Sequence, residues 1–211
     1  MTKTFIFDFD GTLIDSKKAI HQCFQSITKK LAPNRIEYAK NIHIGPPLRD
    51  TASEILGHEY QNSLDEFVQL FIKMHDEQVI HHTQPYPDVI QVLNQLYEKN
   101  IPMALATNKR LAPTQKLMDH FGWNEYFSFI ECSDSQSDMR NKDAMIQNII
   151  YQNKIFLGSY FVGDTVSDGL SANLNKLKFI KACYGYGYNQ DWSKITINKT
   201  IKSFNQILEL I

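Results

Sequence analysis

The stretch Phe5-Ile6-Phe7-Asp8-Phe9-Asp10-Gly11-Thr12 decides the fold, because it joins an apolar run directly to two acids and a turn. An apolar run without alternation suits a parallel strand that helices cover on both faces. In open α/β sheets, ligands bind outside the carboxyl ends of the strands, which is where Asp8 would lie. Gly11 allows the chain to turn sharply away. The stretch therefore predicts the first strand of an α/β sheet with polar chemistry at its end.

Further runs of the same kind follow along the chain. Together with the first run, we expect strands over Thr4–Asp8, Met103–Thr107, Phe127–Cys132, Ser159–Gly163 and Lys178–Cys183. Helical patterns lie between them, over Asp88–Asn100, Leu111–Phe121 and Asp143–Gln152. Gly122 is a natural C-cap for the second of these helices. Strands that alternate with helices predict an α/β fold with a doubly wound, mainly parallel sheet.

The stretch from Ser16 to Gln84 breaks this alternation. It has helical periodicity and no convincing strand, with candidate helices over Lys17–Leu31, Pro47–Leu56 and Leu64–His82. Pro85-Tyr86-Pro87 cannot continue a helix and indicates a linker. We predict an inserted α-helical domain over residues 16–84 and an α/β core over residues 1–15 and 85–211. The alternative is that these helices cover one face of the sheet.

Size and composition bound the class of protein. The 211 residues suffice for one large domain or two small ones, and a net charge of −1 produces no global field toward nucleic acid or an anionic membrane. No apolar run approaches the roughly 20 residues that span a bilayer. Three scattered cysteines suit reduced thiols, and we expect no signal peptide. We expect a cytoplasmic monomer or homodimer that binds a small molecule, no nucleic acid and no membrane.

Asp8 and Asp10 lie two residues apart. Two such carboxylates repel each other unless a cation or a proton compensates their charge. A hard cation that takes oxygen ligands, most often Mg²⁺, would do so and leave coordination positions for phosphate and water. A strand end followed by an Asx turn is the alternative for these two residues alone.

The segment Thr107-Asn108-Lys109 places a hydroxyl, an amide and a cation just after the strand Met103–Thr107. A threonine hydroxyl and neighbouring backbone N–H groups can bind phosphate oxygens without adding charge. An ordinary strand-to-helix turn with Asn108 as the cap explains the same residues equally well.

The segment Arg140-Asn141-Lys142-Asp143 opens a helix and places Lys142 at its start. Cations are disfavoured at a helix N-terminus, so Lys142 makes sense if it points into an acidic, phosphate-bearing pocket. We interpret Arg140 as an exposed surface residue.

Two more acids follow the strand Ser159–Gly163. Asp164 is placed to complete a metal site with Asp8. Asp168 lies four residues further on, within reach of Lys142 or of a metal-bound water.

Together the four segments resemble the haloacid dehalogenase superfamily of aspartyl-phosphate enzymes, over essentially the whole chain. The resemblance implies a Rossmann-like core in which each motif residue has a role: Asp8 is the nucleophile, Asp10 the general acid and base, Thr107 the hydroxyl of the second motif, Lys142 the lysine of the third, and Asp164 and Asp168 the acids of the fourth.

Finer features are similar to the phosphoglycolate phosphatase-like branch: Gly45-Pro46-Pro47-Leu48, Tyr86-Pro87, Thr107-Asn108-Lys109 and Tyr184-Gly185-Tyr186-Gly187. This likeness implies a Mg²⁺-dependent phosphatase that acts on a small phosphate ester, phosphoglycolate-like or a nucleoside monophosphate. The helical stretch would be its cap, where Arg49 could bind a substrate carboxylate or a second anionic group.

On this interpretation Mg²⁺ is held by Asp8, the main-chain carbonyl of Asp10 and Asp164. The equatorial oxygens of the phosphoryl group are held by Lys142, Thr107 and Asn108. Three alternatives stay open: a phosphosugar mutase of the β-phosphoglucomutase type, a pyrophosphatase, and a non-catalytic binding module. The intact set of acids and lysine argues against the last.

Overall fold

The computed structural model describes residues 3–135, 141–153, 155 and 158–211. The chain divides into two compact units. We call Met1–Asp15 with Pro85–Ile211 the α/β unit, and Ser16–Gln84 the helical unit. Arg140, interpreted above as a surface residue, lies outside the described residues.

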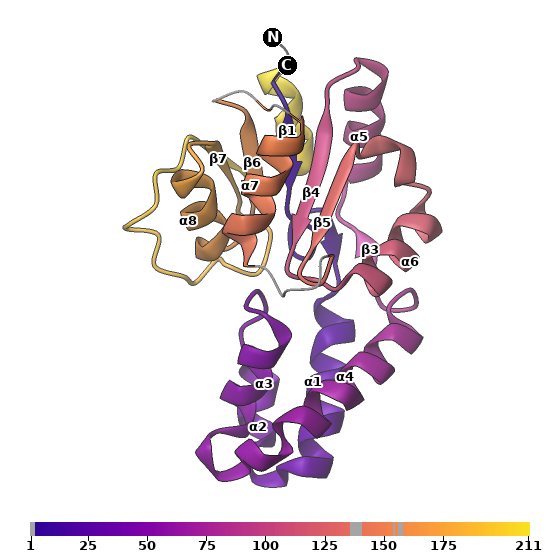
Figure 1. Ribbon diagram of the computed structural model, residues 1–211, viewed down its shortest axis with the longest axis vertical. Helices are drawn as coiled ribbons and strands as arrows, with labels where there is room; N and C mark the ends of the chain where they lie inside the picture. The colour runs from indigo at the N-terminus through magenta and orange to yellow at the C-terminus, as the bar shows by residue number, and fades with distance from the viewer. Residues whose placement is uncertain (1–2, 136–140, 154, 156–157) are drawn as a thin grey trace. The chain divides into compact units, whose positions relative to one another are not determined.

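A six-stranded sheet forms the centre of the α/β unit, in the order β5-β4-β1-β6-β7-β8 (Figure 1). All neighbouring strands are parallel. The strands are β1 Phe5–Phe7, β4 Met103–Thr107, β5 Phe129–Cys132, β6 Tyr160–Gly163, β7 Lys178–Ala182 and β8 Lys199–Ile201. Phe7 pairs with Leu105 of β4 and Val162 of β6, so β1 occupies an inner position. The predicted α/β fold with a mainly parallel sheet is confirmed.

Helices cover both faces of this sheet. They are α5 Val89–Glu98, α6 Leu111–Phe121, α7 Lys142–Asn153 and α8 Val166–Leu174, with short 3₁₀ helices η3 Asn124–Tyr126 and η4 Phe204–Leu210. Successive residues of a strand point to opposite faces. Ile6 accordingly packs in a cluster with residues of α7 and α8, whereas the ring of Phe7 lies 5.7 Å from that of Phe204 in η4.

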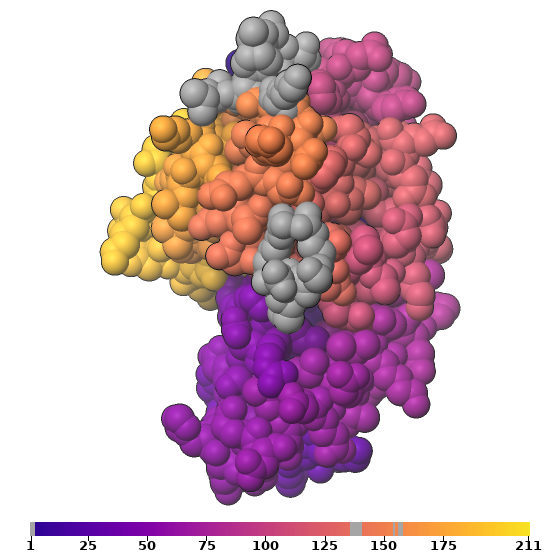
Figure 2. Space-filling model, in the orientation of Figure 1, coloured from indigo at the N-terminus to yellow at the C-terminus, as the bar shows by residue number. Residues whose placement is uncertain are grey.

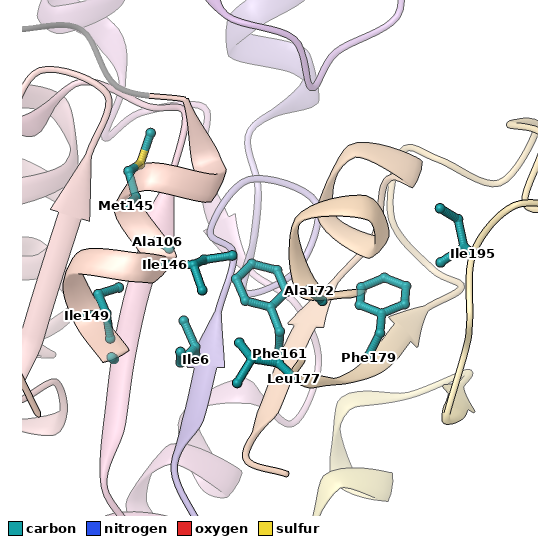
Figure 3. Packing of buried hydrophobic residues seen from close by; sticks show 11 residues of the cluster. Ile6, Ala106, Met145, Ile146, Ile149, Phe161, Ala172, Leu177, Phe179 and Ile195 are labelled. Atoms are coloured by element: carbon teal, nitrogen blue, oxygen red, sulfur yellow. The ribbon is translucent and has the colours of Figure 1, made fainter. Parts of the chain in front are cut away.

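The cluster beneath α7 and α8 is the main core of one face (Figure 3). Ile6 and Phe161 come from neighbouring strands, and Ile146 of α7 and Ala172 of α8 pack against them. All four side chains are fully buried. The other side of α7 lies at the surface of the α/β unit (Figure 2, orange). This core holds the first residue of α7, Lys142, at a fixed distance from the ends of the strands.

The helical unit contains four α-helices and two 3₁₀ helices: α1 Lys17–Leu31, η1 Pro33–Arg35, α2 Ile36–Asn41, α3 Leu48–Leu56, η2 His58–Ser63 and α4 Leu64–Gln78. Phe24 of α1 packs on Phe67 and Phe71 of α4, with ring centroids 6.2 and 4.8 Å apart. A helical insert in an α/β chain is thus confirmed. Two short strands, β2 Ile14–Asp15 and β3 Gln84–Pro85, pair where the chain passes from one unit to the other.

Element boundaries differ from the sequence expectations at a few places. The helix expected to reach His82 ends at Gln78, and the strand expected from Phe127 starts at Phe129. Gly122 is the expected C-cap of α6, with a φ of 70° in the left-handed region. Helix α2 and strand β8 were not predicted, because both are short and lack a clear apolar period. No described helix combines the length and the apolar composition that a bilayer-spanning segment needs.

Candidate active site

Asp8 follows the inner strand β1 directly and is buried. Its backbone N–H donates to the Val162 carbonyl of β6 at 2.9 Å, which fixes the chain at this point. Because β4 and β6 flank β1 in parallel, the segments that follow these strands all emerge at the same edge of the sheet. Side chains from distant parts of the sequence therefore meet around Asp8.

Lys142, the first residue of α7, places its ammonium group between Asp8 and Asp168. Its Nζ lies 2.7 Å from Oδ1 of Asp8 and 2.6 Å from Oδ1 of Asp168. Burial by itself lowers the pKa of Lys142, but Asp168 and Asp8 outweigh it and raise that pKa above its ordinary value. The ammonium stays charged, and the two carboxylates compensate for its position at a helix N-terminus.

Asp8, Asp164 and Asp168 form a compact group of acids. One carboxylate oxygen from each lies within 4.8 Å of the others, and all three residues are buried. Burial, and then repulsion from Asp168, raise the pKa of Asp8 to about 7, although Lys142 opposes the shift. The same two causes, with the charge of Asp8, raise the pKa of Asp164 well above its ordinary value. Negative charge in this cluster exceeds what one lysine neutralises.

This excess of buried negative charge suits a hard cation. The cluster offers carboxylate oxygens only. Hard cations such as Mg²⁺ and Ca²⁺ prefer oxygen ligands, unlike the softer transition metals. Among the acids, histidines and cysteines in the described part of the chain, these three acids are the group that lies close enough together to share an ion. The side chain of Asp10 is outside it, so a metal contact from Asp10 would come from its main chain.

Asp168 is held in place by the start of helix α8. Its Oδ2 accepts hydrogen bonds from the backbone N–H of Thr165 at 2.9 Å and from the Thr165 hydroxyl at 2.7 Å. The Thr165 hydroxyl in turn accepts from the Asp168 N–H, which completes a capping box. One oxygen of Asp168 thus caps the helix while the other binds Lys142. The ammonium of Lys142 is thus shared between Asp168 and Asp8.

Asp164 is held by one backbone donor and one side-chain donor. Its Oδ2 accepts from the Tyr186 N–H at 2.5 Å, and its Oδ1 accepts from the Thr12 hydroxyl at 3.2 Å. A Cβ atom placed on Gly185 would lie 2.3 Å from the Cβ of Asp164, and one on Gly11 would lie 2.3 Å from its Oδ2. Glycine at both positions lets the chain pass close enough to fix the orientation of this carboxylate.

The end of β4 supplies the remaining polar groups. Thr107 is buried, and its hydroxyl accepts from the Lys109 N–H at 3.1 Å, which leaves the hydroxyl hydrogen able to donate. Asn108 follows and is partly buried. The ammonium of Lys109 lies 3.1 Å from Oδ1 and 3.3 Å from Oδ2 of Asp10. A second buried lysine therefore serves the second acid of the first motif.

Arg49 lies in the helical unit, in the first turn of α3. Its Nη2 is 2.8 Å from Oδ1 of Asp65, and both side chains are more than half exposed. An exposed ion pair of this kind contributes little to stability, so the arginine can exchange this partner for another anion at small cost.

Three contacts of the site were not anticipated from the sequence: the Lys109–Asp10 ion pair, the Thr12 hydroxyl on Asp164, and the Tyr186 N–H on Asp164. Lys109 and Thr12 stood beside residues already singled out, so proximity to a motif was a usable signal. The N–H of Tyr186 carried none, because any residue other than proline has one.

Comparison with known proteins bears on this arrangement. The family model described as haloacid dehalogenase-like hydrolase matches residues 5–182. A phosphoglycolate phosphatase from Psychrobacter arcticus is 25% identical, across 98% of this chain and 94% of that protein. A 5'-nucleotidase from Pseudomonas aeruginosa is 23% identical, across 86% of this chain and 83% of that protein.

Solved structures agree in fold. The crystal structure of a predicted phosphoglycolate phosphatase from Haemophilus somnus superimposes with a TM-score of 0.86 at 21% identity, over 99% of this chain and 97% of that one. These matches confirm the resemblance inferred from the four motifs, and with it the prediction of an enzyme of the phosphatase type. Because the family model matches most of this chain, the chain belongs to the haloacid dehalogenase-like hydrolase family.

Proposed function

We propose that this chain is a Mg²⁺-dependent phosphatase that hydrolyses a small phosphorylated metabolite through an aspartyl-phosphate on Asp8. The observation that carries the proposal is the contact of Lys142 with both Asp8 and Asp168 inside a buried cluster of three acids. Such a cluster needs a cation, and a cation beside a carboxylate nucleophile can also bind the oxygens of a phosphate ester.

In the proposed reaction, a carboxylate oxygen of Asp8 attacks phosphorus in line, and the bond from phosphorus to the substrate oxygen breaks. Asp10 gives a proton to the departing oxygen. Asp10 then takes a proton from the water that attacks the phosphorus of the aspartyl-phosphate, which releases phosphate and restores Asp8. The acid next to the strand end is the nucleophile, and the acid two residues on shuttles the proton.

Lys142, Thr107 and Asn108 would hold the equatorial oxygens of the transferring phosphoryl group. Asp8, Asp164 and the main-chain carbonyl of Asp10 would hold Mg²⁺, with Asp168 orienting Lys142. When bound, Mg²⁺ supplies positive charge that offsets the repulsion between the nucleophile and the phosphate. The hydroxyl of Thr107 and the ammonium of Lys142 supply donors that need no rearrangement as the charge moves.

The helical unit is proposed to be a cap that selects the substrate. The two-unit division and the insertion of the helices after β1 support this role. Arg49, whose present partner is the exposed Asp65, is proposed to bind a carboxylate or second anionic group of the substrate. We propose phosphoglycolate or a nucleoside monophosphate as the substrate, and similarity to a phosphoglycolate phosphatase and to a 5'-nucleotidase supports the choice.

A phosphate-release screen tests the function. The purified chain is assayed with Mg²⁺ on phosphoglycolate, nucleoside monophosphates, hexose phosphates and pyrophosphate, with a matched EDTA arm. We expect metal-dependent release from phosphoglycolate or a nucleoside monophosphate. Isomerisation of a hexose phosphate without phosphate release would indicate a mutase, and activity confined to pyrophosphate a pyrophosphatase. Absence of metal-dependent turnover on the whole panel would indicate a binding module.

We extend the proposal to partners and location. A small phosphate ester as substrate fits a cytoplasmic enzyme that works as a monomer or homodimer. Light scattering coupled to gel filtration measures the mass of the assembly against the 24.5 kDa of one chain. A mass above that of two chains would contradict this part of the proposal.

A further inference from the structure

Two buried lysines serve two different acids at the carboxyl edge of the sheet. Lys142 contacts Asp8, and Lys109 contacts both carboxylate oxygens of Asp10. Lys109 is only 8% exposed, yet it takes no part in the reaction proposed above. Removing a charge from water is costly unless the charge is well paired. Its position therefore asks for a reason beyond general charge balance.

The backbone of Lys109 is fixed from both sides. Its N–H donates to the Thr107 hydroxyl at 3.1 Å, and its carbonyl accepts from the Ser133 N–H at 3.2 Å. These contacts tie the residue to the ends of β4 and β5. The Lys109 side chain therefore reaches Asp10 from a backbone position that these hydrogen bonds fix.

Contacts hold Asp10 both beside its backbone and at its side chain. The turn after it is closed by the Gly11 N–H donating to the Ile14 carbonyl at 2.9 Å. The Asp10 side chain is 16% exposed, against 5% for that of Lys109. A carboxylate on a short, partly exposed side chain can rotate, and a donor that contacts both oxygens restricts that rotation.

We propose that Lys109 is a positioning residue for Asp10, holding its carboxyl group in the orientation that proton transfer needs. The inference rests on the proposed function. In the first step a proton leaves Asp10 for the departing oxygen, and in the second a proton leaves water for Asp10. Lys109 keeps its own protons throughout. A misplacement of about 1 Å at such a group costs on the order of 10²-fold in rate.

Leaving groups of different basicity separate positioning from mere structural support. A nitrophenolate departs without a proton, whereas an alkoxide needs one from Asp10. The quantity to compare is kcat/KM, because it reports only on steps up to release of the alcohol and excludes hydrolysis of the aspartyl-phosphate. The substrates are 4-nitrophenyl phosphate, phenyl phosphate and the best alkyl phosphate from the screen.

We expect Lys109→Met to lower kcat/KM for the alkyl phosphate by about 10²-fold and that for 4-nitrophenyl phosphate by less than about threefold. Lys109→Gln, which retains a shorter donor, should show the same ordering with smaller losses and serves if the Met variant does not fold. Lys116→Met, an exposed position on α6, should match the wild-type chain on every substrate.

A double-mutant cycle with Asp10→Asn completes the test. If Lys109 acts through Asp10, Lys109→Met should cost little more once Asp10 is replaced. Equal losses on aryl and alkyl phosphates, or a full additional loss in the Asp10→Asn background, would overturn the positioning role while leaving the phosphatase intact. A wild-type chain with no Mg²⁺-dependent turnover on any of these esters would overturn the proposed function, and this inference with it.

Discussion

The Nζ atom of Lys142 lies 2.7 Å from Oδ1 of Asp8, although 134 residues separate the two in the chain. The same ammonium lies 2.6 Å from Asp168, whose other oxygen caps helix α8. The start of one helix is therefore linked through a single lysine to the start of another and to the end of the inner strand. Loss of the Lys142–Asp8 contact should therefore lower both the stability and the activity of the chain.

Replacing Lys142 by Met removes the ammonium from a buried cluster of acids. We expect kcat to fall by about 10²–10³-fold, the usual loss for a donor to a developing charge. The free energy of unfolding should fall by about 3–5 kcal/mol at pH 8, since buried carboxylates lose their compensating charge. Phosphate release and urea unfolding measure the two effects. Lys116→Met on the exposed side of α6 is the control, and an unchanged kcat for Lys142→Met would contradict its assigned role.

The acid cluster predicts a pH-dependent response to Mg²⁺. Folding raises the pKa of Asp8 from 3.8 to about 7, so between these values the folded metal-free chain holds more protons than the unfolded one. The stability that Asp8 contributes to the metal-free chain is present at low pH and is lost as the pH rises toward 7. The proposed Mg²⁺ would bind the ionised acids, so its stabilising effect should grow with pH.

The increase in Tm on adding Mg²⁺ is measured at pH 5.5 and pH 8. We expect the larger increase at pH 8, and a much smaller one at both values for Asp164→Asn. An increase that is equal at the two pH values would show that no proton competes with the ion in this cluster.

Gly185 controls the placement of Asp164. In Gly185→Ala the new Cβ would lie 2.3 Å from the Cβ of Asp164 and 2.3 Å from the Gly11 carbonyl oxygen. We expect a loss of about 1–3 kcal/mol in stability and a higher Mg²⁺ concentration for half-maximal activity, because Asp164 must move. Titration of activity with Mg²⁺ measures the second effect.

Gly122→Ala is the matched control for this variant. Nothing lies within 4 Å of a Cβ there, but the φ of 70° strains any side chain. It should cost about 1 kcal/mol in stability and leave the Mg²⁺ dependence unchanged. Identical Mg²⁺ curves for the two variants would contradict the role given to Gly185.

Thr165 couples the cap of α8 to Asp168. Thr165→Ala removes the hydroxyl that accepts from the Asp168 N–H and donates to its Oδ2. We expect a loss of about 1–2 kcal/mol in the free energy of unfolding, together with reduced kcat as Asp168 loses a constraint. Thr165→Ser keeps the hydroxyl and should retain most of both. Urea midpoints and steady-state rates decide the matter, and an Ala variant as stable and active as the Ser variant would exclude the coupling.

The sequence predicted the elements whose physics is local or periodic. Asp8 and Asp164 follow apolar runs, and parallel strands that end at one edge bring such residues together. Lys142 was recognisable because a cation at a helix start needs a compensating charge. The Lys109–Asp10 pair was not, since it depends on side-chain rotamers across two loops. Likewise the contact from the Tyr186 N–H uses a backbone group that every such residue carries.

The short elements were missed for a related reason. Strand β8, Lys199–Ile201, has three residues and only one fully buried apolar side chain, Ile201. Its place in the sheet comes from pairing with β7, with Lys181 opposite Thr200. A strand that depends on its neighbour for definition leaves little trace in its own composition.

Chemical trapping tests most directly whether Asp8 is the nucleophile. The chain is mixed with a phosphorylated substrate and Mg²⁺, quenched in acid within a turnover, reduced with borohydride and digested for mass spectrometry. Borohydride converts an aspartyl-phosphate to homoserine, so we expect homoserine at position 8 in the wild-type chain and none in a folded, inactive Asp8→Asn variant. Phosphate release that persists in Asp8→Asn, or a label at another residue with Asp8 unmodified, would contradict it.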